Sequence, residues 1–369
     1  AAHPGKDVTL SFDTRVQYAA YRELARGVAE HNATAGVLVS LDVNTGEVLA
    51  MANLPSYNPN NRKQLTVDAL RNRAVTDQFE PGSTLKPFTV AAALESGKFN
   101  VHSHFNTSPG TYKVLNKLIR DHENYGVIDM PTLLTKSSNV ASAQIAMALP
   151  RDTLPLLHRR LGFGHRTGSG FPGESAGSMQ PSNRWNPVEI ATMSYGYGVT
   201  VTALQLAQAY AVIASGGIQR PISFTKVTGP VPGKRILDEK IARAIIPMME
   251  TVVTQEGTAL RAAVPGYRIA GKTGTAHKAQ GGGYASDAYM SLFVGMAPAS
   301  APRVVTAIII DNPRQGGYYG GLAAAPVFSR MMSDTLRLMN IEPDRSAERL
   351  AEQHRFPHPS TWARPGREG

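Results

Sequence analysis

The chain has 369 residues, 42% of them hydrophobic, and a formal net charge of +10. This length and composition predict a globular protein with a large core and two or three subdomains. The sequence contains no cysteine, which excludes a disulfide framework, a thiol nucleophile and a cysteine-ligated metal.

The positive charge suits an anionic partner, although a soluble basic surface explains it equally simply. No block of Lys and Arg with interleaved aromatic residues occurs, which argues against nucleic-acid binding. The sequence has neither a run of about 18 apolar residues nor a signal peptide. Residues 1–6 resemble a cut linker, so we expect a fragment of a longer protein.

The N-terminal part of the chain predicts a helix, a β-hairpin and a second helix. Asp13 or Thr14 can cap the first helix, and the hairpin turn Asn44-Thr45-Gly46 has glycine where a positive φ is needed. In chain order the elements are a helix at residues 14–30, strands at 36–43 and 47–53, and a helix at 68–76.

The middle of the chain, from residue 83 to about 215, has a mainly helical pattern. An insert at about residues 99–127 interrupts it and is rich in loop-forming residues. The expected helical runs are residues 130–149, 154–161, 188–194 and 202–215.

Strand patterns return in the last third of the chain. The expected order is a short strand at 220–227, an amphipathic helix at 240–254, strands at 267–275, 288–297 and 303–311, and a helix at 325–339. The Pro- and Arg-rich tail beyond Pro343, residues 344–369, is expected to be loose.

Together these elements predict an α+β fold. A lone hairpin is marginal in water, so the N-terminal strands should join the three late strands in one five-stranded antiparallel sheet flanked by the terminal helices. We expect one domain over residues 1–343, with a sheet subdomain of residues 8–60 and 217–343. A mostly helical subdomain, residues 61–216, would be inserted in it, and the cleft between the two is the expected site.

A serine and a lysine at a predicted helix start are the first catalytic candidates. Ser83 and Lys86 lie three positions apart, which puts both on one helix face. Pro81 suits a helix start, and Pro87 lacks the N–H that would bond the Ser83 carbonyl, so we expect a 3₁₀-like first turn. Taken alone, an N-cap serine beside a solvated lysine is the better explanation, because a second S-x-x-K occurs at residues 223–226.

Two further motifs follow in order. Ser137-Ser138-Asn139 lies at a junction between helical segments, and Lys272-Thr273-Gly274-Thr275 lies in the first late strand. A K-T-G triplet alone is expected by chance in roughly one chain in twenty of this length. The ordered set of three motifs is typical of active-site serine β-lactamases and penicillin-binding proteins.

Five stretches resemble class B penicillin-binding proteins, in particular the septal D,D-transpeptidases of the FtsI or penicillin-binding protein 3 type. They are residues 80–88, 136–140, 195–198, 271–276 and 317–321. The resemblance implies the fold shared by these transpeptidases and the serine β-lactamases. It also implies that a membrane anchor and a pedestal domain are missing from this chain.

The resemblance implies a catalytic role for each motif residue. Ser83 would attack the carbonyl between two terminal D-alanines and form an acyl-enzyme, with Lys86 as its base. Burial and the charge of Lys272 would lower the pKa of Lys86. Ser137 would relay protons between Lys86 and the leaving amine, and Asn139 would hold a substrate amide.

Substrate-binding roles follow from the same resemblance. Thr273 and Thr275 would bind the terminal carboxylate together with the lysine of their motif, and Gly274 would let the strand approach the substrate backbone. The backbone N–H groups of Ser83 and Thr275 would form the oxyanion hole. Three tyrosines would wall the cleft, with core or turn packing as the alternative: Tyr197, Tyr318 and Tyr319.

The resemblance implies no cofactor and no metal. Its implied partners are peptidoglycan stem peptides, lipid-linked precursor strands and β-lactam antibiotics, together with an FtsW-type glycosyltransferase and divisome proteins. The protein would crosslink stem peptides during septal cell-wall synthesis at the periplasmic face of the bacterial inner membrane.

Two other classes share part of this pattern. A serine β-lactamase needs a base that drives deacylation, and no E-x-x-L-N-like segment lies between Asn139 and Lys272. A penicillin-recognising sensor would need an N-terminal signalling domain, whereas the intact motif set argues against a pure scaffold. Residues 277–287 differ from the longer basic loop of the family, and a flexible loop there would alter β-lactam affinity.

Overall fold

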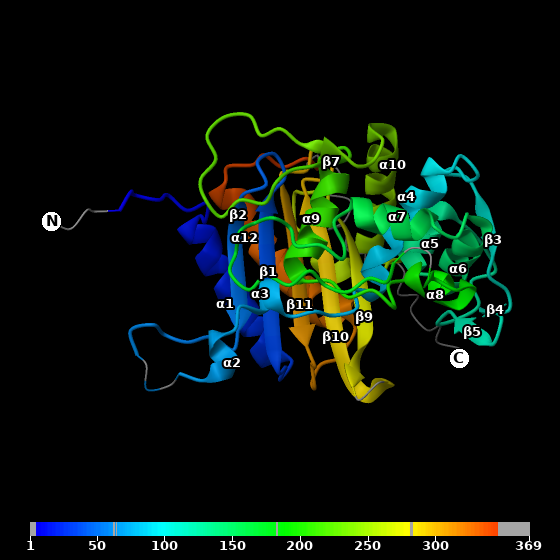
Figure 1. Ribbon diagram of the computed structural model, residues 1–369, viewed down its shortest axis with the longest axis horizontal. Coiled ribbons are helices and arrows are strands. Elements are labelled where there is room, and N and C mark those ends of the chain that lie inside the picture. Colours follow the sequence, from blue (N-terminus) through cyan, green and yellow to red (C-terminus); the bar gives the residue numbers. More distant parts are fainter. Residues whose placement is uncertain (1–4, 62, 64, 182–183, 281–282, 346–369) are drawn as a thin grey trace, which may run out of the picture.

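The computed structural model describes residues 5–61, 63, 65–181, 184–280 and 283–345. Within these residues the largest sheet has five strands, all antiparallel, in the order β2-β1-β11-β10-β9 (Figure 1). The predicted α+β fold with one sheet built from both chain ends is therefore confirmed. The strands are β1 (Ala35–Asp42), β2 (Val48–Leu54), β9 (Ala270–Gln280), β10 (Gly283–Ala297) and β11 (Val304–Asp311).

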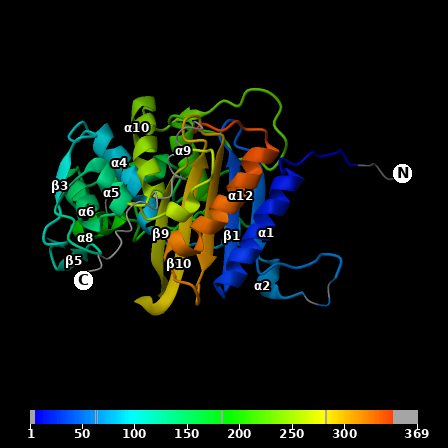
Figure 2. The same ribbon diagram turned by 180° about the vertical axis from the view of Figure 1, so that it is seen from behind.

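The two terminal helices, α1 (Thr14–Glu30) and α12 (Ala325–Leu338), cover one face of this sheet (Figure 2). Asp13 caps α1 by accepting hydrogen bonds from the amides of Arg15 and Val16. The helices pack closely at Gly27, where an added Cβ would lie 2.4 Å from a methyl carbon of Val327. A glycine at this position therefore sets how near α12 comes to α1.

A buried helix, α9 (Ala203–Ala214), contacts β1 and β11. Almost every residue of α9 is buried, and a capping box between Thr202 and Gln205 closes its N-terminus. Helix α10 (Glu239–Glu250) contacts α9, β9 and the helical part of the molecule. These two helices connect the sheet to the helices beyond its β9 edge.

The helical part lies beyond the β9 edge of the sheet (Figure 1). Its central helix, α4, is buried along most of its length, so it can present a side chain at its N-terminus in one fixed place. The helices are α4 (Lys86–Glu95), α5 (Met130–Lys136), α6 (Asn139–Ala148), α7 (Thr153–Arg160) and α8 (Pro187–Met193). The proposed subdomain boundaries stay a prediction.

Some predicted elements are divided in the structure. The helix expected at 68–76 is two short helices, α2 (Val67–Leu70) and α3 (Arg73–Thr76), because Arg71 has an extended backbone. The run expected at 130–149 breaks at Ser137, whose φ is 59°. The helix expected at 240–254 ends as α10 at Glu250 and continues as the 3₁₀ turn η4 (Thr251–Val253).

The strand predicted at 220–227 is wrong. Ser223 and Thr225 form isolated bridges with two different segments, and the amides of Thr225 and Val227 bond to side chains, so no continuous ladder forms. The strand at this place is β7 (Ile218–Gln219), which pairs with β8 (Lys234–Arg235).

The insert at 99–127 contains two small sheets that the loop-rich pattern did not predict. Strand β3 (His104–Asn106) pairs with β6 (Val127–Asp129), and β4 (Thr111–Val114) pairs with β5 (Lys117–Arg120). The strands have three or four residues each, which is too short for an alternation pattern to stand out.

Two expectations concern segments that the structure describes only in part. Residues 277–280 and 283–287, expected to form a flexible loop, continue β9 and β10 instead. The predicted loose tail lies outside the described residues from 346 onward, while the Asp344 carboxylate accepts hydrogen bonds from the amides of Arg268 and Ser300. Among the described residues, no helix is both long and apolar enough to cross a membrane.

Candidate active site

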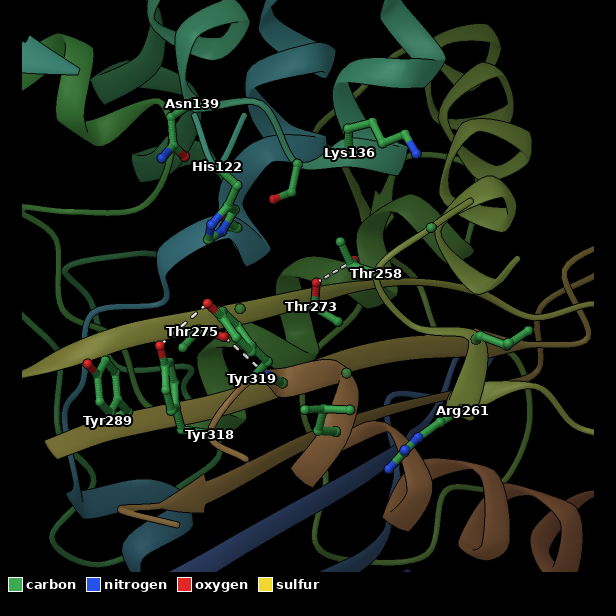
Figure 3. Close-up of a pocket in the computed structure, with 18 of the residues that line it drawn as sticks. His122, Lys136, Asn139, Thr258, Arg261, Thr273, Thr275, Tyr289, Tyr318 and Tyr319 are labelled. Carbon is green, nitrogen blue, oxygen red and sulfur yellow. Dashed lines mark hydrogen bonds between the residues drawn. The ribbon is translucent and has the colours of Figure 1, made fainter. Parts of the chain in front are cut away.

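A cleft of about 680 Å³ opens between strand β9 and the helical part of the molecule. In Figure 3, His122, Lys136 and Asn139 lie on one side, and Thr273, Thr275 and the tyrosines lie on the other. Nine residues predicted from the sequence line this cleft: Ser83, Ser137, Asn139, Tyr197, Thr273, Gly274, Thr275, Tyr318 and Tyr319. The other two, Lys86 and Lys272, have fully buried side chains whose Nζ atoms reach Ser137.

Ser83 lies in a short 3₁₀ turn, η2 (Gly82–Leu85), directly before α4. The Ser83 carbonyl accepts its hydrogen bond from the amide of Lys86 instead of from Pro87, which confirms the predicted 3₁₀ start. Gly82 has a φ of 54°, and its amide donates to the Gly196 carbonyl at 3.1 Å. The η2 turn is therefore stabilised by a hydrogen bond to Gly196 as well as by its own sequence.

Gly196 must be glycine for two independent reasons. Its φ is 91°, and an added Cβ would lie 1.9 Å from the Gly82 carbonyl oxygen. Any side chain there would displace the turn that carries Ser83. This explains physically why the Tyr195-Gly196-Tyr197-Gly198 stretch accompanies the serine motif.

The Nζ atom of Lys86 has four oxygen atoms around it. The Ser137 carbonyl lies 2.5 Å away and the Asn139 Oδ1 atom 2.8 Å away, and both are acceptors only. The Ser83 and Ser137 hydroxyl oxygens each lie 3.0 Å away. Two Lys86 protons are thus bound to the pure acceptors, and the remaining position faces the hydroxyls.

The pKa of Lys86 is lowered well below its ordinary value. Burial is the main cause, and the nearby charge of Lys272 acts in the same direction, whereas Asp121 opposes it. A neutral Lys86 would direct its lone pair at the serine hydroxyls, because its two protons are already bound. The site therefore has the geometry of a general base, and the pKa of Lys86 is shifted in the direction that this role requires.

Ser137 ends helix α5 in the left-handed conformation, with a φ of 59°. Its Oγ atom lies 3.0 Å from Lys86 Nζ and 2.9 Å from Lys272 Nζ. A non-glycine residue at positive φ is uncommon and costs backbone energy. Here the strained residue places one hydroxyl between two amines.

Asp121 holds the start of α6 in place, and no sequence pattern indicated it. Its carboxylate accepts hydrogen bonds from the Ser138 hydroxyl at 2.6 Å and from the amides of Asn139 at 2.5 Å and Val140 at 3.0 Å. A carboxylate at a helix N-terminus also complements the helix dipole. Asp121 comes from the loop after β5, so only the fold brings it to this helix.

The Asn139 side chain is bound on both sides. Its Oδ1 accepts from Lys86, and its Nδ2 donates to the Arg120 carbonyl at 3.0 Å. Because the Arg120 carbonyl is an acceptor only, these bonds also fix which end of the amide faces Lys86. Asn139 therefore lines the cleft in a single orientation, in which it positions Lys86.

Lys272 lies in β9, and burial lowers its pKa to about 7. The hydroxyls of Thr273 and Thr275, which share one face of the strand, are also fixed. The Thr273 hydroxyl lies 2.7 Å from the Thr258 hydroxyl, and the Thr275 hydroxyl accepts from the Gly320 amide at 3.1 Å. Thr258 was not predicted from the sequence, because no motif surrounds it.

Gly274 has a packing role that the sequence interpretation missed. An added Cβ would lie 2.9 Å from both the Pro81 carbonyl oxygen and a methyl carbon of Thr84. The glycine thus lets η2 approach β9, which brings the serine turn and the Lys272 motif side by side.

A row of rings forms one rim of the cleft (Figure 3). Tyr318 stacks on Tyr289 with ring centroids 4.0 Å apart and touches Tyr319 at 4.6 Å. Tyr319 meets His122 at 5.9 Å, and Tyr289 meets His277 at 4.6 Å. The sequence indicated only Tyr318 and Tyr319 of this row.

Tyr197 lies apart from this row, against Tyr195, with ring centroids 5.8 Å apart. No group of three or more His, Asp or Glu side chains could hold a metal ion among the described residues.

Comparison with known proteins places this geometry in context. The family model described as the penicillin binding protein transpeptidase domain matches residues 36–333. The chain is 47% identical over 344 residues to the peptidoglycan D,D-transpeptidase FtsI of Escherichia coli, covering 93% of this chain and 58% of that protein. It is 43% identical over 343 residues to the probable peptidoglycan D,D-transpeptidase PenA of Neisseria gonorrhoeae, covering 93% and 59%. The chain thus spans about three fifths of the length of these relatives.

A solved structure is also similar. The transpeptidase domain of Burkholderia pseudomallei penicillin-binding protein 3, determined without ligand, matches with a TM-score of 0.85 and 39% identity. The match covers 93% of this chain and all of that one.

Proposed function

Because this chain belongs to the penicillin-binding protein transpeptidase family, we propose that it is the catalytic domain of a peptidoglycan D,D-transpeptidase. One observation supports this most strongly. The Ser83 hydroxyl, Lys86, the Ser137 hydroxyl and Lys272 form a continuous line with neighbouring atoms 2.9 to 3.0 Å apart. Such a line can carry a proton away from a nucleophile and deliver it to a leaving group.

In the acylation step, the Ser83 Oγ atom attacks the carbonyl carbon between two terminal D-alanines. Its proton passes to neutral Lys86 as the new C–O bond forms. The oxyanion that develops is stabilised by backbone N–H groups of Ser83 and Thr275. When the C–N bond breaks, the proton moves from Lys86 through the Ser137 hydroxyl to the departing amine, and D-alanine leaves.

In the transfer step, an amine of a neighbouring stem peptide attacks the Ser83 ester. A new amide forms, the bond between the carbonyl carbon and Ser83 Oγ breaks, and Ser83 regains its proton. The donor's terminal carboxylate, which leaves with D-alanine, is bound during the earlier acylation step by the hydroxyls of Thr273 and Thr275 and by the charge of Lys272. The tyrosine row would contact the rest of the donor peptide.

A β-lactam would acylate Ser83 in the same way and leave slowly. Hydrolysis of the ester needs a base that activates water, and none of the described residues lining the cleft is a carboxylate. This favours a transpeptidase over a β-lactamase. A penicillin-recognising sensor would also acylate, but the resemblance to named transpeptidases over 93% of the chain favours the enzyme.

The similarity to FtsI supports a septal role for the whole protein. It would work at the periplasmic face of the inner membrane with lipid-linked precursor strands. An FtsW-type glycosyltransferase and other divisome proteins are the expected partners.

Intact-protein mass spectrometry with benzylpenicillin tests the proposal. We expect a stable mass increase of one penicillin that is lost in Ser83→Ala. Ser223→Ala is the matched control, because Ser223 begins the second S-x-x-K and its hydroxyl bonds to the Thr225 carbonyl. Rapid hydrolysis of penicillin would indicate a β-lactamase, and intact penicillin without an adduct would contradict any acyl-enzyme.

A further inference from the structure

A second cavity, of about 580 Å³, lies at the other end of the sheet from the tyrosine row. Tyr289 lies in β10 on the side of the tyrosine row, Ala297 is the opposite end of that strand, and this cavity lies beyond Ala297, where the β1–β2 turn meets the β10–β11 loop. The end of α9 and one face of α10 complete it. We call it the arginine pocket, after four lining residues: Arg220, Arg243, Arg268 and Arg303.

The arginine pocket has more cationic groups than anionic ones. Glu250, the one carboxylate among its described lining residues, binds Arg268 through two bonds of 2.9 and 2.7 Å. Arg243 pairs with Glu239 of its own helix, and both side chains are more than half exposed. That leaves two arginines whose charge no carboxylate offsets.

These two arginines have unused hydrogen-bond donors. Arg303 is exposed, and its guanidinium makes no hydrogen bond or ion pair within the part of the chain that the structure describes. Arg220 donates through Nη1 to the Val43 carbonyl at 3.1 Å, while its buried Nε has no partner among the described residues. The Arg303 carbonyl accepts from the Val43 amide, so both arginines flank Val43.

The surroundings favour a carboxylate over a free phosphate. Phosphate sites commonly use backbone N–H groups at a helix N-terminus, and α9 supplies none here because it presents its C-terminal end, at Ser215 and Gly216. The dipole of that end opposes any anion, so the attraction must come from the arginine side chains. The Arg268–Glu250 pair demonstrates that the pocket accommodates a planar, two-bond carboxylate. Apolar groups also line it, from Ile246, Pro247, Ala299, Ala301 and Pro302.

We propose that the arginine pocket binds an acidic peptide segment of a partner protein. A carboxylate of that segment binds the exposed guanidinium of Arg303, with the positive charge of Arg220 also lining the pocket, and a neighbouring aliphatic side chain packs on Ile246 and Pro302. The volume is within the range of about 300 to 1,000 Å³ that is usual for ligand sites. The site is independent of Ser83 and of the proposed transpeptidase activity.

Fluorescence anisotropy with a labelled peptide of alternating Glu and Leu tests this, using the full chain already acylated by benzylpenicillin so that the cleft is blocked. The matched probe has Gln in place of each Glu. We expect the Glu peptide to bind and the Gln peptide to bind at least about tenfold more weakly, with affinity falling as salt rises.

Arg303→Glu should weaken binding of the Glu peptide by about tenfold or more. Arg151→Glu is the control, because Arg151 is an exposed arginine of the helical part that lies outside the pocket. Unchanged binding in Arg303→Glu, or equal loss in the control, would overturn the assignment. Displacement of the peptide by inorganic phosphate, added at the same total negative charge as the peptide, would show that the pocket is a phosphate site instead.

Discussion

The Nζ atom of Lys272 lies 2.9 Å from the Oγ atom of Ser137, and the Lys272 side chain is completely buried. This contact joins a β-strand to a helix junction 135 residues earlier in the chain. It places a second amine next to the hydroxyl that Lys86 also contacts. The charge state of the site therefore depends on three segments at once.

Replacing Lys272 with Met should move the pH profile of acylation to higher pH. The charge of Lys272 lowers the pKa of Lys86, so its removal raises that pKa and a larger fraction of Lys86 is protonated at a given pH. The rate constant for acylation by benzylpenicillin, measured against pH, reports the midpoint. Thr273→Val is the control, since it removes a neighbouring hydroxyl without changing charge, and should lower the rate with the midpoint unmoved. An identical midpoint in Lys272→Met would contradict the coupling.

The same Lys272→Met variant should be more stable than the unaltered protein at acidic and neutral pH. The folded-state pKa of Lys272 is about 7, below its unfolded value of about 10.4, so the unfolded chain binds the extra proton between these two pH values. Stability of the unaltered protein therefore rises with pH across this window. The full change in the free energy of unfolding across this window is at most roughly 5 kcal/mol.

Urea unfolding of both proteins at several pH values measures this difference. The advantage of the variant should be largest below pH 7 or so and shrink toward pH 10 or so. A constant difference at all pH values would mean that the buried lysine does not titrate as described.

Asp121→Asn should slow acylation by about 10- to 100-fold, because its charge and three accepted hydrogen bonds hold the segment that carries Ser137 and Asn139. Loss of the charge also lowers the pKa of Lys86 further, so the pH midpoint should move to lower pH, opposite to the Lys272 variant. Kinetics of penicillin acylation against pH measure both effects.

Asp129→Asn is the matched control for this prediction. Asp129 caps α5 by accepting from the Thr132 amide at 2.9 Å, and its carboxylate has no hydrogen bond or ion pair with the motif residues in the described part of the chain. Asparagine caps a helix as well as aspartate does, so Asp129→Asn should cost only the charge–dipole contribution of about 0.3 to 1 kcal/mol and leave acylation nearly unchanged. If both variants slow acylation equally, the effect of Asp121 is a general loss of stability.

Gly196→Ala should destabilise the protein by several kcal/mol or displace the Ser83 turn, because the new Cβ would overlap the Gly82 carbonyl. Gly97→Ala has the same kind of strain, with a φ of 67° but open space around the new Cβ, and should cost roughly 1 kcal/mol. Thermal unfolding together with acylation compares the two. Similar losses in both variants would show that backbone strain alone accounts for the effect.

Local chemistry determined much of the site from the sequence alone. Ser83 and Lys86 are three residues apart across the 3₁₀ turn that leads into α4, where positions i and i+3 lie one above the other, so their contact follows from local geometry. The 3₁₀ start follows from Pro87, and the sheet follows from apolar strands that are too few to be stable apart. The short strands of the insert escaped prediction because three or four residues do not establish a period.

Only the tertiary structure determined the features that depend on distant segments. Three contacts join parts of the chain that share no local sequence pattern. They are the contact of Lys272 with Ser137, the hydrogen bond that Asp121 accepts from Ser138, and the ring contact of His122 with Tyr319. The lowered pKa of Lys86 was expected from the family resemblance, and the structure confirms its direction and causes, whereas the lowered pKa of Lys272 was not predicted. A pKa depends on burial and on neighbouring charges, and both are properties of the packed molecule that a sequence motif does not encode.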